Sequence, residues 1–507
     1  MKDINKNTGA PKKALVIGAG FAGLSAATFL ANKGWDVTVL EKHNLPGGRA
    51  RKFEAQGFVF DMGPSWYWMP DVFEKYFSNF GKKVSDYYNL KRLDPSYRVY
   101  FDTTAWDIPS NYTELQNLLE SVEPGAGKAL DKFMEEAKYK YEVGVGKLVH
   151  QPGQSIMEFI DWDVIKGVFK LDIFQSMKNH IARFFKHPHI QMLMEFPVLF
   201  LGALPEKTPA LYSLMNYADI KGGTWYPEFG MYSIVNAMHK VAIEQGVKFK
   251  FSEQVNTINV ENGKAVNATS TNTITKEKSI HEFDVVVGAG DYHHIETQLL
   301  APQYQSYSAS YWDSRLLAPS SLLYYVGLNK KLNGATHHSL FFDTDFGLHG
   351  KEIYTQPSWP TNPLFYASVP SVTDPTVAPE GMENLFLLIP VAAGLEGDTE
   401  EIREKYFQQI IKRLEQKWGQ TILDSIVYKR SFAVADFKSE YHSFKGNAYG
   451  LANTLLQTAI LKPSCKSKKV KNLYYTGQLT VPGPGVPPSL ISGEVVAGLI
   501  NHDFKNN

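Results

Sequence analysis

Apolar and polar positions form their clearest pattern near the amino terminus, where two short apolar runs flank a helical stretch. Residues 14–17 (ALVI) and 37–40 (VTVL) are β-type runs, and the segment between them is rich in small apolar residues up to Lys33. Gly34 follows, and glycine commonly ends a helix. The pattern predicts a strand, a helix and a second strand, which together form a βαβ unit.

The turn that leads into this helix carries a glycine pattern with a chemical use. Gly18 allows a tight turn, Gly20 lets the backbone approach a pyrophosphate, and Gly23 lets the helix pack closely on the sheet. Glu41 follows the second strand, where a carboxylate accepts hydrogen bonds from the ribose hydroxyls and repels a 2′-phosphate. A glycine-rich turn that binds nothing is the simpler interpretation. Strand, helix, second strand and acid in register favour a dinucleotide site.

The rest of the chain divides into helical and mixed stretches. Charged residues and helix formers dominate residues 71–150, and residues 154–219 are helical and unusually apolar. A helix is predicted at residues 231–245. Further strands are predicted at residues 247–251, 255–260 and 283–287.

The last of these strands ends in Gly288-Ala-Gly290-Asp, which suggests a second dinucleotide turn. Position 293 is a histidine rather than the third glycine. A separate NAD(P)H domain is therefore not expected.

A second glycine loop after the first βαβ unit indicates which dinucleotide cofactor binds. Gly47 and Gly48 bring more backbone onto the pyrophosphate, and Arg49 adds a bidentate cationic contact. The stretch from Glu41 to Ala50 resembles the corresponding motif of the flavoprotein superfamily of amine oxidases and carotenoid desaturases. The resemblance implies FAD rather than NAD.

The carboxyl-terminal region adds a third element of the same site. Residues 472–478 (NLYYTGQ) predict a strand, and residues 481–489 (VPGPGVPPS) a loop before an apolar helix that starts near Leu490. Reduced flavin carries negative charge near N1 and O2, which the amino terminus of that helix and free N–H groups stabilise. We therefore expect one FAD site assembled from distant segments.

The chain resembles the bacterial-type carotenoid desaturases, phytoene desaturase and its relatives, from end to end. Five blocks carry the resemblance: GAGFAGL (18–24), EKHNLPGGRA (41–50), FDMGPSWYWMPDVFEKYF (60–77), GGTWYPEFGMYSIVNAM (222–238) and TGQLTVPGPGVPPSLISGEVVAG (476–498). With the residue patterns above, it implies these FAD contacts: Gly18, Gly20, Gly23, Glu41, Gly47, Gly48, Arg49, Gly63, Pro64, Ser65, Val255, Gly477, Gln478, Gly485, Val486 and Pro487.

The expected fold is α/β, with two domains in a chain of 507 residues. A Rossmann-like FAD-binding domain is predicted from residues 1–75, 225–300 and 441–507. A mixed α+β substrate domain with a helical, membrane-associating subregion is predicted from residues 76–224 and 301–440.

Composition excludes some functions. Lysine plus arginine and aspartate plus glutamate each total 52, so no basic field favours nucleic acid. The single cysteine, Cys465, excludes an internal disulfide and fits a reducing cytosol. Its polar surroundings predict a surface thiol. Apart from the glycine-interrupted residues 14–31, no run approaches the ~20 apolar residues of a membrane-spanning helix.

Three histidine pairs are candidates for metal ligands. They lie at 187 and 189, at 293 and 294, and at 337 and 338. None has cysteine or acidic partners at metal-ligand spacing, so no metal is expected and the pairs are interpreted as surface or loop histidines.

The family implies a C40 polyene as substrate. At ~0.8 kcal/mol per buried CH₂, such a molecule stays out of water, so the enzyme is expected to be peripheral to the inner face of the cell membrane. Residues 192–204 are an apolar segment preceded by Arg183, Lys186, His187 and His189, which suits a tunnel lining or a membrane-dipping helix. An ordinary buried core helix fits equally well. The expected electron acceptor is oxygen or a quinone.

The implied chemistry removes a hydride from an allylic carbon and a proton from its neighbour. The ring of Trp225, beside an expected flavin loop, offers a π face to the cationic carbon chain. Simple packing is its alternative role. Glu195 lies inside the apolar segment, where a raised pKa would let it accept the proton. A position at a helix edge in water is the alternative.

The main prediction is a phytoene desaturase that forms lycopene by repeated two-hydrogen removals. A terminal 3,4-desaturase of a hydroxylated carotenoid would need the same cofactor site and tunnel. A carotenoid isomerase or saturase of the same fold and an amine oxidase also remain open. A prenyl-binding escort protein with a vestigial FAD site is the non-enzymatic alternative.

Overall fold

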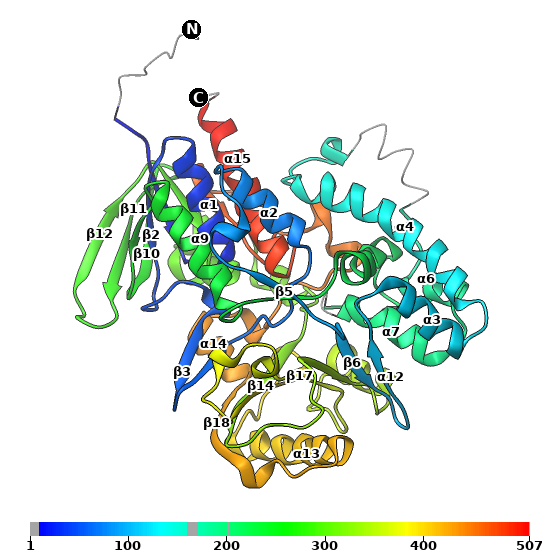
Figure 1. The fold of residues 1–507 in the computed structure, drawn as a ribbon. Coiled ribbons are helices and arrows are strands. Elements are labelled where there is room, and N and C mark those ends of the chain that lie inside the picture. The colour runs from blue at the N-terminus through cyan, green and yellow to red at the C-terminus, as the bar shows by residue number, and fades with distance from the viewer. Residues whose placement is uncertain (1–9, 160–170, 200–201, 506–507) are drawn as a thin grey trace.

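The computed structural model describes residues 10–159, 171–199 and 202–505. A five-stranded sheet, in which all neighbours run parallel, has the order β19-β13-β1-β2-β9. Its strands are β1 (Lys13–Ile17), β2 (Asp36–Leu40), β9 (Lys248–Lys250), β13 (Val285–Gly288) and β19 (Leu473–Tyr475). Segments from the start, middle and end of the chain therefore build one sheet (Figure 1). Because β13 belongs to this sheet, its glycine-containing end is part of the same unit.

Alternate residues of β1 face opposite layers, as the two-residue period of a strand requires. Ala14 and Val16 belong to the large core that includes the helices on one face, whereas Leu15 and Ile17 pack with a second sheet on the other. The helices are α1 (Phe21–Asn32), α2 (Pro70–Ser78), α9 (Tyr232–Glu244) and α15 (Val486–Lys505). The second sheet consists of β10 (Glu253–Glu261), β11 (Lys264–Asn272) and β12 (Lys278–Glu282).

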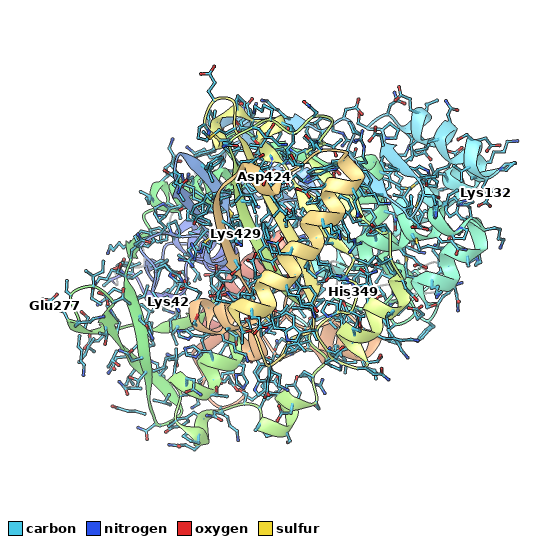
Figure 2. All side chains as sticks on the ribbon, turned by 90° about the horizontal axis from the view of Figure 1, so that it is seen from below. Lys42, Lys132, Glu277, His349, Asp424 and Lys429 are labelled. Atoms are coloured by element: carbon cyan, nitrogen blue, oxygen red, sulfur yellow. The ribbon has the colours of Figure 1, made fainter. Side chains whose placement is uncertain are left out.

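A seven-stranded sheet has the order β18-β14-β17-β16-β15-β6-β7. Its strands are β6 (Tyr97–Tyr100), β7 (Ala105–Ile108), β14 (Ser320–Leu328), β15 (His338–Phe341), β16 (Phe365–Ser368), β17 (Glu383–Val391) and β18 (Ile426–Phe432). Helix α13 (Glu400–Trp418) covers one face, as Figure 2 shows from below. At its edge Lys429 of β18 pairs with Glu404 of α13.

A helical group lies beside the two larger sheets (Figure 1). It contains α3 (Tyr112–Val122), α4 (Ala126–Gly146), α6 (Met177–Phe184), α7 (Pro188–Leu199) and α8 (Leu214–Tyr217). The remaining named strands and helices are β3 (Lys52–Ala55), β4 (Phe58–Asp61), β5 (Leu90–Arg92), β8 (Trp225–Pro227), α10 (Tyr292–His294), α11 (Ala309–Asp313), α12 (Phe346–Tyr354) and α14 (Val434–Tyr441). Together these elements confirm the predicted α/β fold with a Rossmann-like sheet. The predicted domain boundaries stay predictions.

Helix α7 covers much of the apolar segment predicted at residues 192–204. Leu193, Met194, Phe196 and Val198 are buried, as expected for a core helix or a lining. Residues 200 and 201 lie outside the described part of the chain. Among the described helices, none combines the length and hydropathy needed to cross a bilayer.

Three strands, β5 to β7, interrupt the region from 71 to 150 that was predicted from its helix formers. In β6, buried and exposed positions alternate over only a few residues. Tyr97 and Val99 are buried, while Arg98 between them is half-exposed. The exposed side of Arg98 pairs with Asp107 of β7. A four-residue strand gives too few alternating positions to stand out from its charged surroundings.

Two predictions of exposure are wrong. Cys465 is buried, 3.3 Å from Thr480 Oγ1, and burial raises the pKa of its thiol to about 11. His338 is buried in the first position of β15, neither on the surface nor in a loop, and His337 before it is in a loop but buried. In both places the local sequence is polar, but long-range packing covers it.

Candidate active site

The first glycine turn has the close contacts that its sequence pattern predicted. Gly18 has a φ of +104°, a conformation that favours glycine. A Cβ on Gly23 would lie 2.0 Å from the carbonyl oxygen of Gly18, so only glycine lets α1 approach this turn. A Cβ on Gly20 would meet no protein atom within 4 Å. The backbone there faces open space at the amino terminus of α1, as a phosphate site requires.

Glu41 is buried at the end of β2, beside this turn. Its Oε2 accepts a hydrogen bond from Ala19 N at 2.8 Å, and its Oε1 accepts one from His43 N at 3.0 Å. Burial raises the pKa of Glu41, and these two bonds oppose the rise. Each carboxylate oxygen has a second lone pair, so the group retains capacity for ribose hydroxyls.

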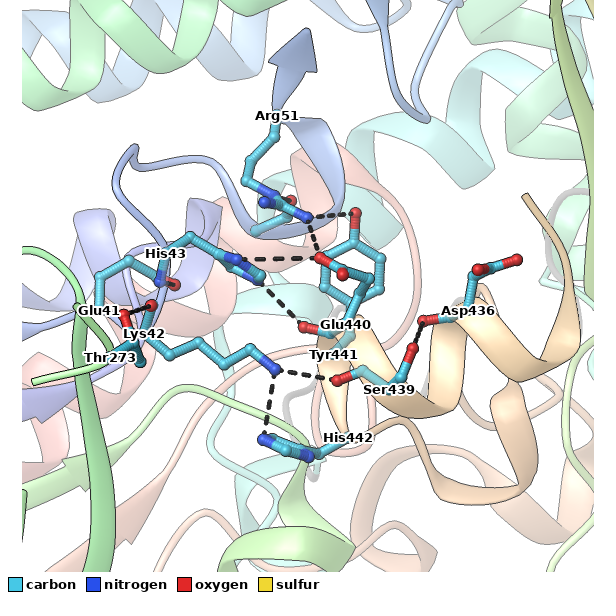
Figure 3. A network of polar contacts seen from close by, with 11 residues as sticks. Glu41, Lys42, His43, Arg51, Thr273, Asp436, Ser439, Glu440, Tyr441 and His442 are labelled. Carbon is cyan, nitrogen blue, oxygen red and sulfur yellow. Dashed lines mark hydrogen bonds and ion pairs between the residues drawn. The ribbon is translucent and has the colours of Figure 1, made fainter. Parts of the chain in front are cut away.

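A polar network holds the loop after Glu41 against α14 (Figure 3). Arg51 Nη2 lies 2.9 Å from a carboxylate oxygen of Glu440, and His43 Nε2 lies 3.0 Å from the Glu440 carbonyl. Lys42 Nζ donates to the carbonyl of Ser439 at 3.0 Å. Burial lowers the pKa of His43 to about 4, so its ring is neutral at neutral pH. The network joins a late segment to the first nucleotide-binding unit.

The second glycine loop touches the first. A Cβ on Gly48 would lie 3.4 Å from Gly20 Cα, and Gly47 has a φ of +118°. The guanidinium of Arg49 donates from Nη2 to Ser443 Oγ at 2.8 Å, whereas its buried Nε has no partner among the described residues. Burial lowers the pKa of Arg49, and the nearby charge of Asp291 opposes this. An unpartnered cationic donor beside two glycine loops suits an anionic ligand.

The carboxyl-terminal loop reaches the same place through close helix packing. A Cβ on Gly493 of α15 would lie 2.4 Å from the carbonyl oxygen of Ala22 in α1. In the amide orientation that satisfies its neighbours, Gln478 accepts a hydrogen bond from Arg49 Nη2 at 2.9 Å. Gly477 and Gly485 have φ values of +115° and +112°. Gly485 is exposed, and Val486 and Pro487 are half-exposed at the first turn of α15.

The remaining predicted contacts border these loops. A Cβ on Gly63 would lie 2.5 Å from the carbonyl oxygen of Arg49. Gly63 and Ser65, with the half-buried Pro64 between them, adjoin a small pocket that Tyr226 and His337 also line. Val255 is buried in β10, the strand in which Glu253 N donates to the Glu41 carbonyl at 2.8 Å. The structure therefore links the Gly18 turn, the Gly47 loop, Glu41 and Gln478 through direct contacts, and the assignment of the other predicted contacts to the cofactor stays a prediction.

An aromatic wall follows directly on Ser65. Trp66 stacks on His338 with ring centroids 4.1 Å apart and an interplanar angle of 10°. Phe196 of α7 contacts Trp66, Trp68 and Tyr97, with centroid distances between 5.2 and 6.1 Å. We define these residues, Trp66, Trp68, Tyr97, Phe196 and His338, as the aromatic wall. Tyr97, Phe196 and His338 are each at most 1% exposed, so these rings pack mainly on one another.

The pairing of His338 with Tyr366 was not predicted from the sequence. His338 Nδ1 lies 2.6 Å from Tyr366 OH, and its buried Nε2 has no partner among the described residues. Tyr366 also hydrogen-bonds the hydroxyls of Ser368 and Ser65. Burial holds the pKa of His338 well below its usual range, so the ring is neutral. The available signal was its position at the start of the β-type run HSLF.

The two predicted catalytic residues occupy different surroundings. Glu195 is buried in α7, one residue before Phe196, and burial raises its pKa to about 7. Trp225 is half-buried and donates from Nε1 to the Gly222 carbonyl at 2.9 Å. The guanidinium of Arg92 lies 5.4 Å from its ring centroid. Arg92 thus already provides a cation beside the ring, which favours a packing role for Trp225.

One cluster of the described residues has metal-ligand types close together. Atoms of Glu136, Asp172 and His180 lie within 4.8 Å of one another. The ammonium of Lys140 lies 2.9 Å from Asp172 and 3.3 Å from His180 Nε2. A protein cation therefore already supplies the positive charge at this cluster.

Comparison with known proteins identifies the family. The sequence profile described as flavin containing amine oxidoreductase matches residues 21–501. The chain belongs to this family. It is 40% identical over 492 residues to a carotenoid 3,4-desaturase of Haloarcula japonica, across 96% of this chain and 98% of that relative. A zeta-carotene-forming phytoene desaturase of Myxococcus xanthus is 30% identical over 492 residues, across 96% of this chain and 93% of that relative.

A solved structure supports the fold. An oxidoreductase from Methanosarcina mazei superposes with a TM-score of 0.63 at 16% identity, covering 96% of this chain and 100% of that one. As a member of the flavin-containing family, the protein is an oxidoreductase that uses FAD. The buried Arg49 Nε and the open space beside Gly20 fit the pyrophosphate of this cofactor.

Proposed function

We propose that the protein desaturates a C40 carotenoid precursor, of the phytoene-to-lycopene type, with FAD as electron acceptor in the active site. Similarity over nearly the whole chain to carotenoid desaturases supports this substrate class. The carrying structural observation is the aromatic wall next to Ser65, in a family whose cofactor is a flavin. A long apolar substrate has no hydrogen bonds to lose when it leaves water for such surroundings.

The FAD contacts proposed from the sequence divide by part of the cofactor. Gly18, Gly20, Gly23, Gly47 and Gly48 would surround the pyrophosphate, Arg49 would pair with it, and Glu41 would bind the ribose. The other contacts would serve the adenine side and the flavin ring: Gly63, Pro64, Ser65, Val255, Gly477, Gln478, Gly485, Val486 and Pro487. Their convergence, including the Arg49 to Gln478 contact of 2.9 Å, supports this assignment.

Bound FAD supplies a hydride acceptor that no amino-acid side chain provides. The aromatic wall excludes water and orients the polyene, which makes the required alignment of donor carbon and ring reproducible. Glu195 would hold the proton removed from the neighbouring carbon, because a carboxylate with a pKa of about 7 accepts a proton near neutral pH.

Terminal 3,4-desaturation of a hydroxylated carotenoid is a second candidate. The observation that favours it is the 40% identity to the Haloarcula japonica enzyme, against 30% for the Myxococcus xanthus phytoene desaturase. Both reactions remove two hydrogens from a C40 chain and need the same apolar wall.

Expression in two pigment backgrounds separates these candidates. In cells that accumulate phytoene, we expect red lycopene in the extract, identified by its absorption spectrum and mass. In cells that accumulate a hydroxylated carotenoid, the second candidate instead predicts a product two hydrogens lighter. Unchanged phytoene with a converted hydroxylated carotenoid would assign the second reaction, and no conversion in either background would refute both.

An exposed apolar patch supports peripheral membrane association at the inner face of the cell membrane. Met157, Phe174, Leu456 and Leu461 have exposed fractions of 70%, 84%, 75% and 47%. Their segments are neighbours. Gly153 adjoins the carbonyl of Ala459, Tyr212 hydrogen-bonds Thr458, and Ala210, two residues before Tyr212, donates to the carbonyl of Gln175 next to Phe174. Such side chains insert into the headgroup boundary and bring the enzyme to its insoluble substrate. Reoxidation by oxygen or a membrane quinone would complete the cycle.

Vesicle flotation tests this patch. We expect the wild type to float with anionic phospholipid vesicles and the double variant Leu456→Asp, Leu461→Asp to stay in solution. Ile274→Asp is the matched control, because Ile274 is 72% exposed but lies on the hairpin between β11 and β12. Equal flotation of all three proteins would refute the assignment of the patch.

A further inference from the structure

Lys462 is a buried cation without a buried anion. Its side chain is 5% exposed, and Nζ donates to Asn453 Oδ1 at 3.0 Å. Among the described residues no carboxylate forms an ion pair with it, and Asn453 is itself buried. Burial alone lowers its pKa to about 7, with no charged neighbour opposing the change. A buried ammonium with one neutral partner is unfavourable unless a ligand completes the site.

The ammonium lies against the loop formed by residues 481–487. A Cβ on Gly483 would lie 3.2 Å from Lys462 Nζ and 3.0 Å from Asn453 Oδ1. Gly483 has a φ of +135°, so both its conformation and its neighbours require glycine. Lys462 and Asn453 therefore contact this loop at Gly483, three residues before α15 begins at Val486.

Lys462 and Arg49, two cationic side chains of the site, lie beside different loops. Arg49 adjoins the two amino-terminal glycine loops, where the proposed function puts the pyrophosphate. Lys462 adjoins the loop assigned to the flavin ring. Oxidised flavin is neutral, but the ring gains negative charge near N1 and O2 when it is reduced, and a fixed cation then becomes favourable.

We propose that the Lys462 ammonium is the counter-charge for the negative charge that bound FAD gains on reduction. The proposal rests on the proposed function in one respect, namely that the 481–487 loop faces the flavin ring. Asn453 is then a positioning residue, because its side-chain oxygen holds the ammonium against Gly483.

Reduction potentials of bound FAD test the proposal without any carotenoid. We expect Lys462→Met to weaken binding of reduced relative to oxidised FAD by about tenfold, which lowers the two-electron potential by about 30 mV. Lys462→Arg keeps the charge and should retain a potential close to that of the wild type. Titration against a redox dye, followed by flavin absorbance, gives the values. An unchanged potential in Lys462→Met would overturn the proposal.

Two further outcomes also test the proposal: equal weakening of both redox states of FAD, and loss of FAD from the variants. If the cation served the pyrophosphate instead, both redox states of FAD would lose affinity equally and the potential would not move, which also overturns the proposal. If Lys462→Met loses FAD, Lys462→Gln takes its place. Loss of FAD in both neutral variants but not in Lys462→Arg would show that the charge binds oxidised FAD as well, which overturns the proposal. Loss in all three variants would assign Lys462 to packing and overturn it too. A failure of the desaturase proposal would appear only in the pigment assays.

Discussion

The nucleotide side and the aromatic wall of this site differ in polarity and in packing. On the nucleotide side, glycines bring backbone within van der Waals contact, and the buried Nε of Arg49 and the buried Glu41 keep capacity for polar ligand atoms. On the wall, large rings fill the space and even the imidazole of His338 is neutral. The comparison shows that the nucleotide side depends on glycines without a Cβ and on charged side chains. The aromatic wall depends on closely packed, uncharged rings.

The largest expected effect comes from adding one carbon on the nucleotide side. Gly23→Ala would put a methyl group 2.0 Å from the Gly18 carbonyl oxygen, so we expect loss of bound FAD and destabilisation of about 3 kcal/mol or more. Flavin absorbance and thermal unfolding measure the two effects. Gly498→Ala on α15 is the control, because its Cβ would meet nothing within 4 Å. Normal FAD content in Gly23→Ala would refute the predicted packing.

Gly20→Ala should fold normally but bind FAD weakly.

Removal of the buried cation is expected to have the next largest effect. Arg49→Met should weaken FAD binding by about 10- to 100-fold, since charge-assisted hydrogen bonds are roughly twice as strong as neutral ones. Titration of the apoprotein with FAD, followed by quenching of flavin fluorescence, gives the dissociation constant. Arg430→Met is the control, because Arg430 is exposed on β18 and packs over the Phe53 ring. Equal affinity in both variants would remove Arg49 from the site.

On the wall side, Glu195 links activity to pH. Its folded pKa of about 7 lies above the ordinary 4.5, so the unfolded chain loses its proton first as pH rises. Stability therefore falls between about pH 4.5 and 7. Glu195→Gln should be more stable than the wild type at pH 8, by roughly 1–3 kcal/mol, and equally stable at pH 4. Denaturant unfolding at both pH values measures this difference.

The same variant tests the catalytic role separately. If Glu195 accepts the substrate proton, Glu195→Gln should lose about 100-fold or more in rate. The wild-type rate should rise as pH increases through about 7. A stabilised variant with wild-type turnover would limit Glu195 to a structural role.

The smallest expected effect concerns Cys465, which lies outside both sides of the comparison. Because burial raises its pKa to about 11, the thiol should react with a soluble thiol reagent at pH 8 only after unfolding. The absorbance of the released chromophore, with and without denaturant, provides the measurement. Rapid labelling of the folded protein would contradict the burial of this residue.

The nucleotide side was largely predictable because its constraints are local. Gly18, Gly20 and Gly23 lie within one turn, and the strand, helix and acid around them have fixed spacing. The wall was not predictable to the same degree. Its stacking partner His338 lies far along the chain from Trp66, and the strand β15 that carries it has only four residues. No local pattern reports such a contact.

By itself the sequence determined the α/β class, the glycine turns, the acid at Glu41 and the resemblance to carotenoid desaturases, because periodicity and short motifs encode local geometry. Only the tertiary structure decided which side chains lose water. It buried Cys465, predicted as a surface thiol, and His338, predicted as a surface or loop residue. It also put Lys462 against Gly483 with no anionic partner among the described residues. The physical reason is that burial is a property of all the elements packed around a residue, whereas spacing is a property of the chain alone.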